Sequence, residues 1–595
     1  MDIDFDIDTN KKIHILQVRP LTSDKYEIEA DDVIFESQIS SVKKFQDLQN
    51  NSPFFVGKSA IFGVMPDWNP AEIIGTKPNV LSFDLYRYLI TDDIWAKQRA
   101  EYGYRDVRPH SLLVLFSGHP YIDVRASFNS FIPATLNNEL AGRLVDYYLL
   151  RLSENPQYHD KVEFEVVPTC YAFDFENWHE LLTKGGFSSE EIEQLGKGLK
   201  KITINAFSRT KEDLKTVQIF KERFDVIFSS KIPPLNKAIL LLEDCRRYGT
   251  LVFAHLARSA FVSITLLKSA VDKKIISQVA MDSFLNSIET VAHEFINDAK
   301  KVADKKKSWS MFVNRYGHLR PGTYDITSET YAENVEKYLR PVVDQACKIK
   351  EDASKYDNEW LDEKESFTSA LYEIGIEVNQ DTIESFLRES IEGREYAKFI
   401  FSRNLSAALD LISEYGKTHG LSRKQLANIS IGTLFSIKSG NINPNDVKDW
   451  LINESQEHSY FHDISNKIEL PPLILSESDF NIFMYPSSQP NYVGSGRVSS
   501  EVVTLSSDVI NHNNSSLGQK ILLIPQADPG FDWIFGHDIA GLITQYGGGN
   551  SHMAIRASEF GLPAAIGVGE ALYKSLSRAS VIELDATNRK IEIIR

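Results

Sequence analysis

A chain of 595 residues with 42% hydrophobic and 11% aromatic residues is long enough to bury several cores, so the sequence predicts a multidomain globular protein. Its formal net charge of -17 argues against a nucleic-acid or membrane-surface role, because both need broad basic faces. Three cysteines without metal-ligand spacing exclude a disulfide framework, and no apolar run approaches the roughly 20 residues of a membrane helix. We therefore expect a cytoplasmic protein with neither nucleic acid nor membrane as a partner.

The first twenty residues have the pattern of two short strands joined by a turn. Ile3, Phe5 and Ile7 alternate with aspartates, and an apolar run resumes from Ile13 to Val18. A hairpin alone is marginal in water. These two strands are therefore expected to be part of something larger.

The central part of the chain is predicted to be largely helical, most strongly between residues 175 and 465. Ser189, followed by two glutamates, is typical of a helix start, and residues 251 to 271 carry apolar side chains at helical spacing. Residues 470 to 507 are rich in proline, serine and glycine, which predicts an inter-domain linker.

The most informative segment runs from Thr544 to Pro563. Its pattern is a strand, a glycine-rich turn, a short helix and a stop. Ser551 is a good residue to cap a helix, which places His552 at the first helical position. Gly561 and Pro563 end the helix.

A histidine at that position is suited to carrying a phosphoryl group. The unpaired backbone N–H groups and the helix dipole favour an added negative charge there. The glycines before it, Gly547 and Gly548 among them, let the backbone approach a phosphate closely. The alternative is a surface helix whose histidine is incidental, which would be the better reading of a lone histidine.

The segment resembles the mobile phosphohistidine domain of the phosphoenolpyruvate-utilising enzymes, which include phosphoenolpyruvate synthase, pyruvate phosphate dikinase and the rifampicin phosphotransferases. The positions that match the family pattern are Thr544, Gly547, Gly548, Ser551, His552, Gly561, Pro563 and Ala564. The resemblance implies that His552 is the catalytic residue and that the phosphate loop surrounds it. The family often has arginine six residues after the histidine; here Ser558 stands there, and Arg556 two residues earlier is expected in the phosphate loop.

The N-terminal hairpin resembles the end of the family's ATP-grasp domain. The resemblance implies that Asp4 and Gln17 ligate magnesium and that Arg19 contacts a nucleotide phosphate, in agreement with the preference of Mg²⁺ for oxygen and of phosphate for arginine. The bulk of an ATP-grasp domain should precede this hairpin. We therefore expect that the sequence as given cannot bind ATP by itself. It is a shortened form of a longer protein, a sequence with a misassigned start, or one half of a split enzyme whose partner is a separate ATP-grasp polypeptide. Mg²⁺ and ATP are the expected cofactors of the complete enzyme.

The phosphate acceptor site is expected in the central region. One stretch runs from Met65 to Glu72, and it is followed by Arg105 and by two Asp-Val-Arg triplets that supply Arg108, Asp123 and Arg125. If residues 121 to 125 form a strand, Tyr121, Asp123 and Arg125 share one face that could bind a charged small molecule. The alternatives are a helix cap at Asn69 and structural ion pairs within the triplets.

A second stretch, residues 316 to 325, combines His318 and Arg320 with a Gly/Pro turn. It resembles a segment in the central domains of phosphoenolpyruvate-synthase-like proteins. The resemblance favours His318 as a base and Arg320 as a phosphate clamp over a purely structural role.

Over nearly its whole length the chain resembles most the L-glutamine kinases of capsular phosphoramidate biosynthesis. This resemblance implies transfer of phosphate from ATP to a histidine and then to the amide of L-glutamine, a small-molecule acceptor. A phosphoenolpyruvate-synthase-like enzyme and a partner-dependent phosphocarrier remain alternatives.

The expected fold class is multidomain α+β. An ATP-grasp remnant is predicted at residues 1–25, a largely helical substrate domain at 26–469, the linker at 470–507, and a swivelling β/β/α phosphohistidine domain at 508–595.

Overall fold

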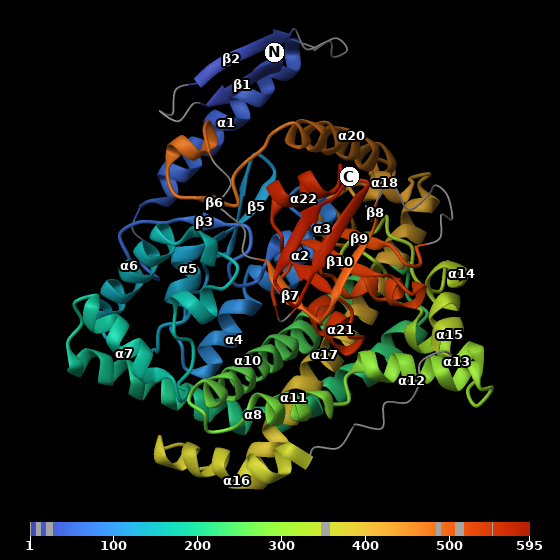
Figure 1. The fold of residues 1–595 in the computed structure, drawn as a ribbon. Coiled ribbons are helices and arrows are strands. Elements are labelled where there is room, and N and C mark those ends of the chain that lie inside the picture. The colour runs from blue at the N-terminus through green and yellow to red at the C-terminus, as the bar shows by residue number, and fades with distance from the viewer. Residues whose placement is uncertain are drawn as a thin grey trace.

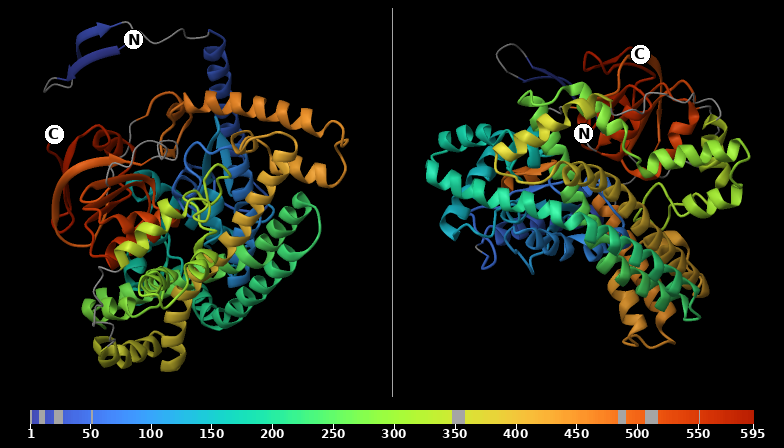
Figure 2. Two further views of the ribbon diagram at one scale, coloured as in Figure 1. Left: turned by 90° about the vertical axis from the view of Figure 1, so that its right-hand side faces the viewer. Right: turned by 90° about the horizontal axis from the view of Figure 1, so that it is seen from below.

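The computed structural model describes residues 2–7, 13–19, 28–50, 52–346, 358–483, 490–505, 517–549 and 551–595, with side chains from residue 32 onward except at positions 358, 529 and 559. Strands β1 (Asp2–Ile7) and β2 (Ile13–Arg19) form an antiparallel hairpin. Figures 1 and 2 show this hairpin beyond helix α1 (Ile28–Leu48), apart from the rest of the molecule.

Long helices form the framework of the central region. Helices α8 (Ser189–Ser229), α9 (Pro234–Asp244), α10 (Leu251–Asp272) and α17 (Gln380–Thr418) pack side by side. The cap of α8 is Ser188, not Ser189 as the sequence suggested, because Ser188 and Glu191 complete a reciprocal capping box. The segment Pro234–Asp272 is long and apolar enough to cross a membrane, but 67% of its most apolar window is buried inside the protein, as in a core helix.

Shorter helices surround this framework. They are α2 (Pro70–Ile73), α3 (Val80–Tyr86), α4 (Ile94–Tyr102), α5 (Val124–Asn129), α6 (Asn138–Glu154), α7 (Phe175–Lys184), α11 (Gln278–Asn286), α12 (Val291–Ala303), α13 (Trp309–Tyr316), α14 (Val335–Tyr338), α15 (Arg340–Ala346), α16 (Asn358–Glu373), α18 (Arg423–Leu426), α19 (Ile431–Lys438) and α20 (Val447–Asn466).

A small antiparallel sheet lies between the helices, in the order β4-β5-β3-β6. Its strands are β3 (Phe62–Gly63), β4 (Leu113–Phe116), β5 (His119–Asp123) and β6 (Leu473–Ile474). The condition that residues 121 to 125 form one strand is not met. Asp123 ends β5 and its carboxylate caps α5 by accepting a hydrogen bond from Ala126 N, so Arg125 lies on a helix and does not share a strand face with Asp123.

The C-terminal unit is built on a seven-stranded sheet in the order β13-β12-β8-β9-β10-β11-β7, in which β8 to β11 run parallel. The strands are β7 (Asn491–Val493), β8 (Arg497–Thr504), β9 (Ile521–Gln526), β10 (Gly541–Tyr546), β11 (Ala564–Ile566), β12 (Val581–Asp585) and β13 (Lys590–Ile593). Helices α21 (His552–Glu559) and α22 (Glu570–Leu576) and the 3-10 helix η6 (Pro529–His537) complete it.

The mostly helical central region and the C-terminal sheet-and-helix unit confirm those parts of the expected fold. The predicted linker at 470–507 is wrong for β7 and β8, because both strands pair within the C-terminal sheet, and for β6, which pairs with β3.

Helices α12 to α15 share a hydrophobic core with the C-terminal unit. Phe295, Tyr338 and Val342 belong to the same buried cluster as Trp533 and Met553. The ring of Tyr338 also makes an edge contact with that of Trp533, with centroids 5.7 Å apart. Residues 291–346 are therefore anchored to the C-terminal unit through apolar packing.

Gly530 of η6 tests this anchoring. A Cβ at this position would lie 2.1 Å from the carbonyl oxygen of Arg320 and 2.4 Å from Pro321 Cα. Gly530→Ala should lower the free energy of unfolding by about 1–3 kcal/mol, because backbone atoms cannot move aside without repacking. Gly432→Ala is the control, since its Cβ would meet only Ser430 Oγ at 3.7 Å within helix α19. Equal stability of the two variants in denaturant titrations would contradict the close contact.

Candidate active site

His552 is the first residue of helix α21, where the sequence placed it. Ser551 caps the helix, its hydroxyl accepting a hydrogen bond from Ala554 N at 3.3 Å. Strand β10 ends at Tyr546 and leads into the turn at Gly547 to Gly549, which precedes the helix. The predicted order of strand, glycine turn and capped helix is confirmed.

The glycine turn is tight on one side and open on the other. Gly547 has a φ of +144°, and a Cβ there would lie 2.6 Å from Ala527 Cβ. A Cβ on Gly548 would meet nothing within 4 Å, and Gly548 lines the cavity described below. The buried hydroxyl of Thr544 accepts a hydrogen bond from Gly567 N at 3.0 Å, so Thr544 supports the turn from beneath.

Each ring nitrogen of His552 is hydrogen-bonded to a carboxylate. Nε2 donates to Asp532 Oδ1 at 2.8 Å, and Nδ1 donates to Glu395 Oε2 at 3.3 Å. Asp532 lies on η6 of the same unit, whereas Glu395 belongs to the central helix α17. The three side chains are 9–12% exposed, so the ring joins two parts of the protein in a largely dry environment.

These contacts hold the ring as an imidazolium. Burial alone would lower the pKa of His552, but the charges and hydrogen bonds of Asp532 and Glu395 outweigh it and raise the pKa to about 9. Burial opposes ionisation of Glu395 too, yet His552 and the charge of Arg394 lower its pKa to about 2. The pKa of Asp532 is lowered by His552 and Arg556 against the effect of burial.

Arg556 lies one turn along α21 from His552 and contacts a carboxylate of the site. Its side chain is buried and contacts Phe535 and Phe560, whose rings stack with centroids 5.1 Å apart. Its Nε donates to Asp532 Oδ1 at 3.3 Å. Arg556 therefore fixes the carboxylate that orients His552, a contact that the sequence did not predict.

His552 opens onto a cavity of about 920 Å³ between the C-terminal unit and the central region. Close to the ring, Arg394 and Lys398 of α17 line it together with Glu72 and Asp528. The ammonium of Lys398 acts electrostatically on Glu72, Asp528 and Glu395. Burial raises the pKa of Glu72 to about 7 even so. Charged groups of both signs thus lie beside the histidine.

Two buried ion pairs and several aromatic rings form another wall of the cavity. Arg99 Nη2 lies 2.5 Å from Asp67 Oδ1, and Arg258 Nη2 lies 2.5 Å from Glu163 Oε1. The aromatic residues include Trp68, Phe164, Phe253 and Phe261. Asp67 and Asn69 adopt left-handed backbone conformations (φ of 61° and 44°), which turns the loop before α2 toward this cavity.

The stretch from Met65 to Glu72 therefore includes residues that line the cavity, but the predicted triplets do not reach it. Arg105 donates to Asn138 Oδ1, and Arg108 forms an ion pair with Asp106. Asp123 caps α5 and accepts a hydrogen bond from His110. Arg125 donates to two backbone carbonyls, Leu48 O and Asn50 O. An ion pair within a triplet is present for Asp106 and Arg108 alone among these contacts. The other residues bind other protein groups, and the predicted role of all four in substrate binding has no support in these contacts.

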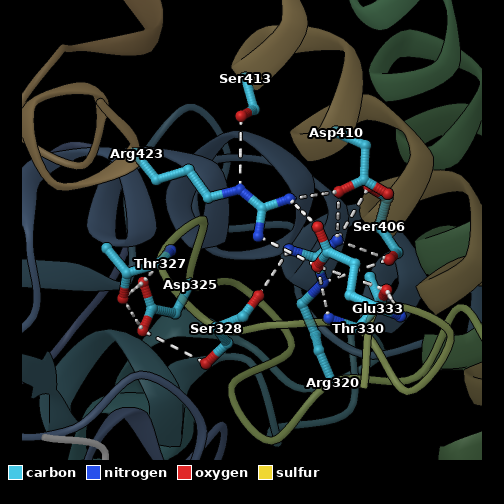
Figure 3. Close-up of polar contacts among 10 residues, drawn as sticks. All are labelled: Arg320, Asp325, Thr327, Ser328, Thr330, Glu333, Ser406, Asp410, Ser413 and Arg423. Atoms are coloured by element: carbon cyan, nitrogen blue, oxygen red, sulfur yellow. Dashed lines mark hydrogen bonds and ion pairs between the residues drawn. The ribbon is translucent and has the colours of Figure 1, made fainter. Parts of the chain in front are cut away.

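His318 and Arg320 lie near the site, but both side chains already form hydrogen bonds with other residues of the chain. Figure 3 shows the buried guanidinium of Arg320 between Ser406 and Asp410, with Ser328 O also accepting from it. Nε2 of His318 is 3.2 Å from Phe399 O, and burial lowers the pKa of His318 to about 3. These contacts do not support the predicted phosphate clamp at Arg320. His318 lines a small cavity of about 50 Å³ that also contacts His552, and its action as a base stays a prediction.

The predicted magnesium and nucleotide ligands fall on the N-terminal hairpin. Its register sets Asp4 opposite Gln17, so the backbone is compatible with a shared cation. The side chains of Asp4, Gln17 and Arg19 lie outside the described residues. Among the residues with described side chains, no group of three His, Cys, Asp or Glu side chains could hold a metal ion.

Sequence reasoning missed four residues of the site: Asp532, Glu395, Arg394 and Lys398. Arg394 and Lys398 are four residues apart and so share one face of a helix, which the sequence does reveal. Nothing in the sequence linked that face to a histidine more than 150 positions away.

The site combines a histidine at a capped helix start with a glycine turn, two carboxylates and a large cavity. Residues 518–589, which carry this histidine, match the family model of the mobile domain of PEP-utilising enzymes. The match includes His552, the glycine turn and Asp532, and it supports a phosphotransferase. A search of curated proteins gave no match.

The raised pKa of His552 predicts a pH-dependent stability. The ring binds its proton more tightly in the folded than in the unfolded protein, so its contribution is complete below pH 6.5 and is lost as the pH rises through about 9. Between these values the wild type should lose up to roughly 3 kcal/mol of unfolding free energy relative to His552→Asn. His537→Asn, in the same unit, should follow the wild type. Parallel stability curves for wild type and His552→Asn would contradict the assignment.

Proposed function

We propose that the chain is a phosphotransferase that moves phosphate from ATP through a phosphohistidine at His552 to a small polar acceptor, with the amide nitrogen of L-glutamine as the favoured acceptor. One observation carries the proposal: His552 stands at a capped helix start, beside a glycine turn, and opens onto a large cavity lined by Arg394 and Lys398. The match of residues 518–589 to a mobile domain of PEP-utilising enzymes agrees with it.

The chemistry needs two transfers. In the first, a ring nitrogen of His552 gives its proton to the carboxylate to which it is hydrogen-bonded and attacks the transferred phosphorus; a nitrogen–phosphorus bond forms, and the bond from phosphorus to the donor oxygen breaks. In the second, the acceptor nitrogen attacks phosphorus and loses a proton, while the ring nitrogen leaves and takes up a proton. The N–H groups at the start of α21 and the open side of Gly548 favour a phosphoryl group next to the ring.

In this proposal the acceptor occupies the cavity. Arg394 and Lys398 offset the negative charge that spreads over the phosphoryl oxygens during transfer. The two wall ion pairs, Arg99–Asp67 and Arg258–Glu163, offer charges of both signs, which suits a zwitterion such as an amino acid. The aromatic wall keeps water from the phosphorylated ring.

Donor chemistry is proposed for the N-terminal hairpin, acting with an ATP-grasp domain. The register partners Asp4 and Gln17 would hold Mg²⁺, and Arg19 would contact a phosphate of ATP. Bound Mg²⁺ would neutralise phosphate charge. The protein is proposed to act in the cytoplasm, in capsule biosynthesis.

Phosphorylation of His552 is the direct test. The chain is mixed with an ATP-grasp fragment and labelled ATP, and acid-labile phosphate is mapped by mass spectrometry at neutral pH. The label should fall on His552, disappear in His552→Asn and persist in His537→Asn. Label that persists in His552→Asn would refute the proposal. Phosphorus NMR with glutamine or pyruvate then identifies the acceptor, and transfer to pyruvate would favour the phosphoenolpyruvate-synthase alternative.

Lys398→Met should separate the two transfers. It removes a cation from the acceptor side of the ring, so decay of phosphohistidine upon addition of acceptor should slow by roughly 10²-fold or more, while phosphorylation of His552 by the donor stays near the wild-type rate. Lys417→Met, at the exposed end of the same helix, is the matched control. Equal decay rates in the two variants, measured by rapid quench, would contradict the role of Lys398.

A further inference from the structure

The ring of His552 is held by carboxylates that belong to different parts of the molecule. Asp532 is on η6, which packs in one core with α21, so Asp532 stays with His552 in any rigid movement of the C-terminal unit. Glu395 is on α17 of the central framework. The hydrogen bond from Nδ1 to Glu395 is therefore the contact that would break if the unit moved away from α17.

Residues 291–346, whose Tyr331 Oη donates to Gly530 O at 2.9 Å, share a core with the C-terminal unit. Among the described polar contacts of this unit with the rest of the central region, the others are weaker or more exposed. Gln526 Nε2 donates to Ala71 O at 3.4 Å. Lys574 and Glu469 lie 3.6 Å apart with about half of each side chain exposed, where an ion pair contributes little. The pair of His552 and Glu395, with 12% and 11% of their side chains exposed, combines opposite charge with burial.

We propose that Glu395 is a positioning residue that holds the unphosphorylated ring of His552 against α17 and repels the same ring once it carries a phosphoryl group. The inference rests on the proposed function, because it needs His552 to be the phosphorylated residue.

The sign of the charge on His552 changes during the cycle. An imidazolium carries one positive charge, whereas a phosphoryl group bound to a ring nitrogen brings a charge of about -1.5 to -2. At the observed separation, attraction to the Glu395 carboxylate becomes repulsion. The same change of charge acts on Asp532. Its neighbour Arg556 offsets the resulting repulsion within the C-terminal unit.

Glu395 has two positively charged neighbours on α17. Arg394 precedes Glu395, and Lys398 follows it by one turn on the cavity side. Among the described residues, the charged groups around the ring are Asp532 and Arg556 from the C-terminal unit, Asp528 from the turn before η6, Glu72 from α2, and Glu395, Arg394 and Lys398 from α17. Arg394 and Lys398 offset the charge of the phosphoryl oxygens during the transfer itself, and Glu395 captures the ring after the phosphoryl group has left. Because this contact stabilises the dephosphorylated ring, it favours completion of the second transfer.

Two readouts test this role on the full chain. The first is the pKa of the His552 ring, measured by nitrogen NMR on histidine-labelled protein. The second is the position of the C-terminal unit, measured by electron-electron resonance between spin labels at Ser575→Cys on α22 and Gln456→Cys on α20, both exposed, in a Cys347→Ser background. Potassium phosphoramidate serves as the phosphorylating reagent, so the test does not depend on an ATP site.

In the wild type at pH 7 we expect one narrow distance distribution, which broadens when phosphoramidate is added or when the pH rises above that needed to deprotonate the ring. Glu395→Gln should lower the ring pKa by at least one unit and give the broad distribution already at pH 7, without further response to either treatment. Glu395→Asp should restore part of the ring pKa and part of the narrow distance distribution. Glu392→Gln, on the same helix and bonded to Glu289 N, should match the wild type.

A Glu395→Gln variant with wild-type ring pKa and wild-type distances would overturn the inference. The inference would also be overturned if phosphorylation of the wild-type ring left the distance distribution narrow. The proposed function would survive that result. Failure to find acid-labile phosphate on His552 under any donor would defeat the proposed function, while the pH series would still decide whether Glu395 holds the ring.

Discussion

Burying the ring of His552 removes it from water, and two carboxylates supply the charge that keeps it protonated. Asp532 and Glu395 reach opposite nitrogens of the ring, and each is itself held by an arginine or lies beside one. A buried charge without such partners is costly. The loss of either carboxylate therefore changes the protonation state of the residue on which the proposed chemistry depends.

The rest of the structure keeps this arrangement in place. Thr544 and Gly547 shape the turn that precedes α21, and Arg556 fixes Asp532 from the apolar side. Helices α12 to α15 share a core with the C-terminal unit, while α17 brings Glu395, Arg394 and Lys398 from the central framework. The cavity lies where these parts meet, so its walls come from segments far apart in the chain.

The sequence was sufficient for the local geometry around His552, because capping serine, glycine turn and terminating Gly-Leu-Pro act over a few residues. The same local signals gave the helical central region. The sequence could not give Glu395 or Asp532 as partners, because tertiary packing alone brings them to the ring. Local reasoning also extended the strand at Asp123 by two residues, since the polar alternation there is equally compatible with the helix that Asp123 caps. Proline and glycine between residues 470 and 507 were interpreted as a linker, yet the segment supplies strands to both sheets of the folded body.

The central claim is that phosphate on His552 is an intermediate and not a side product. The most direct measurement is a chase: the chain labelled on His552 is freed of nucleotide, mixed with unlabelled acceptor, and sampled by rapid quench. The account predicts that the label leaves His552 and appears in the acceptor at a rate no slower than turnover of the complete system. Label that remains on His552 while turnover continues would contradict it.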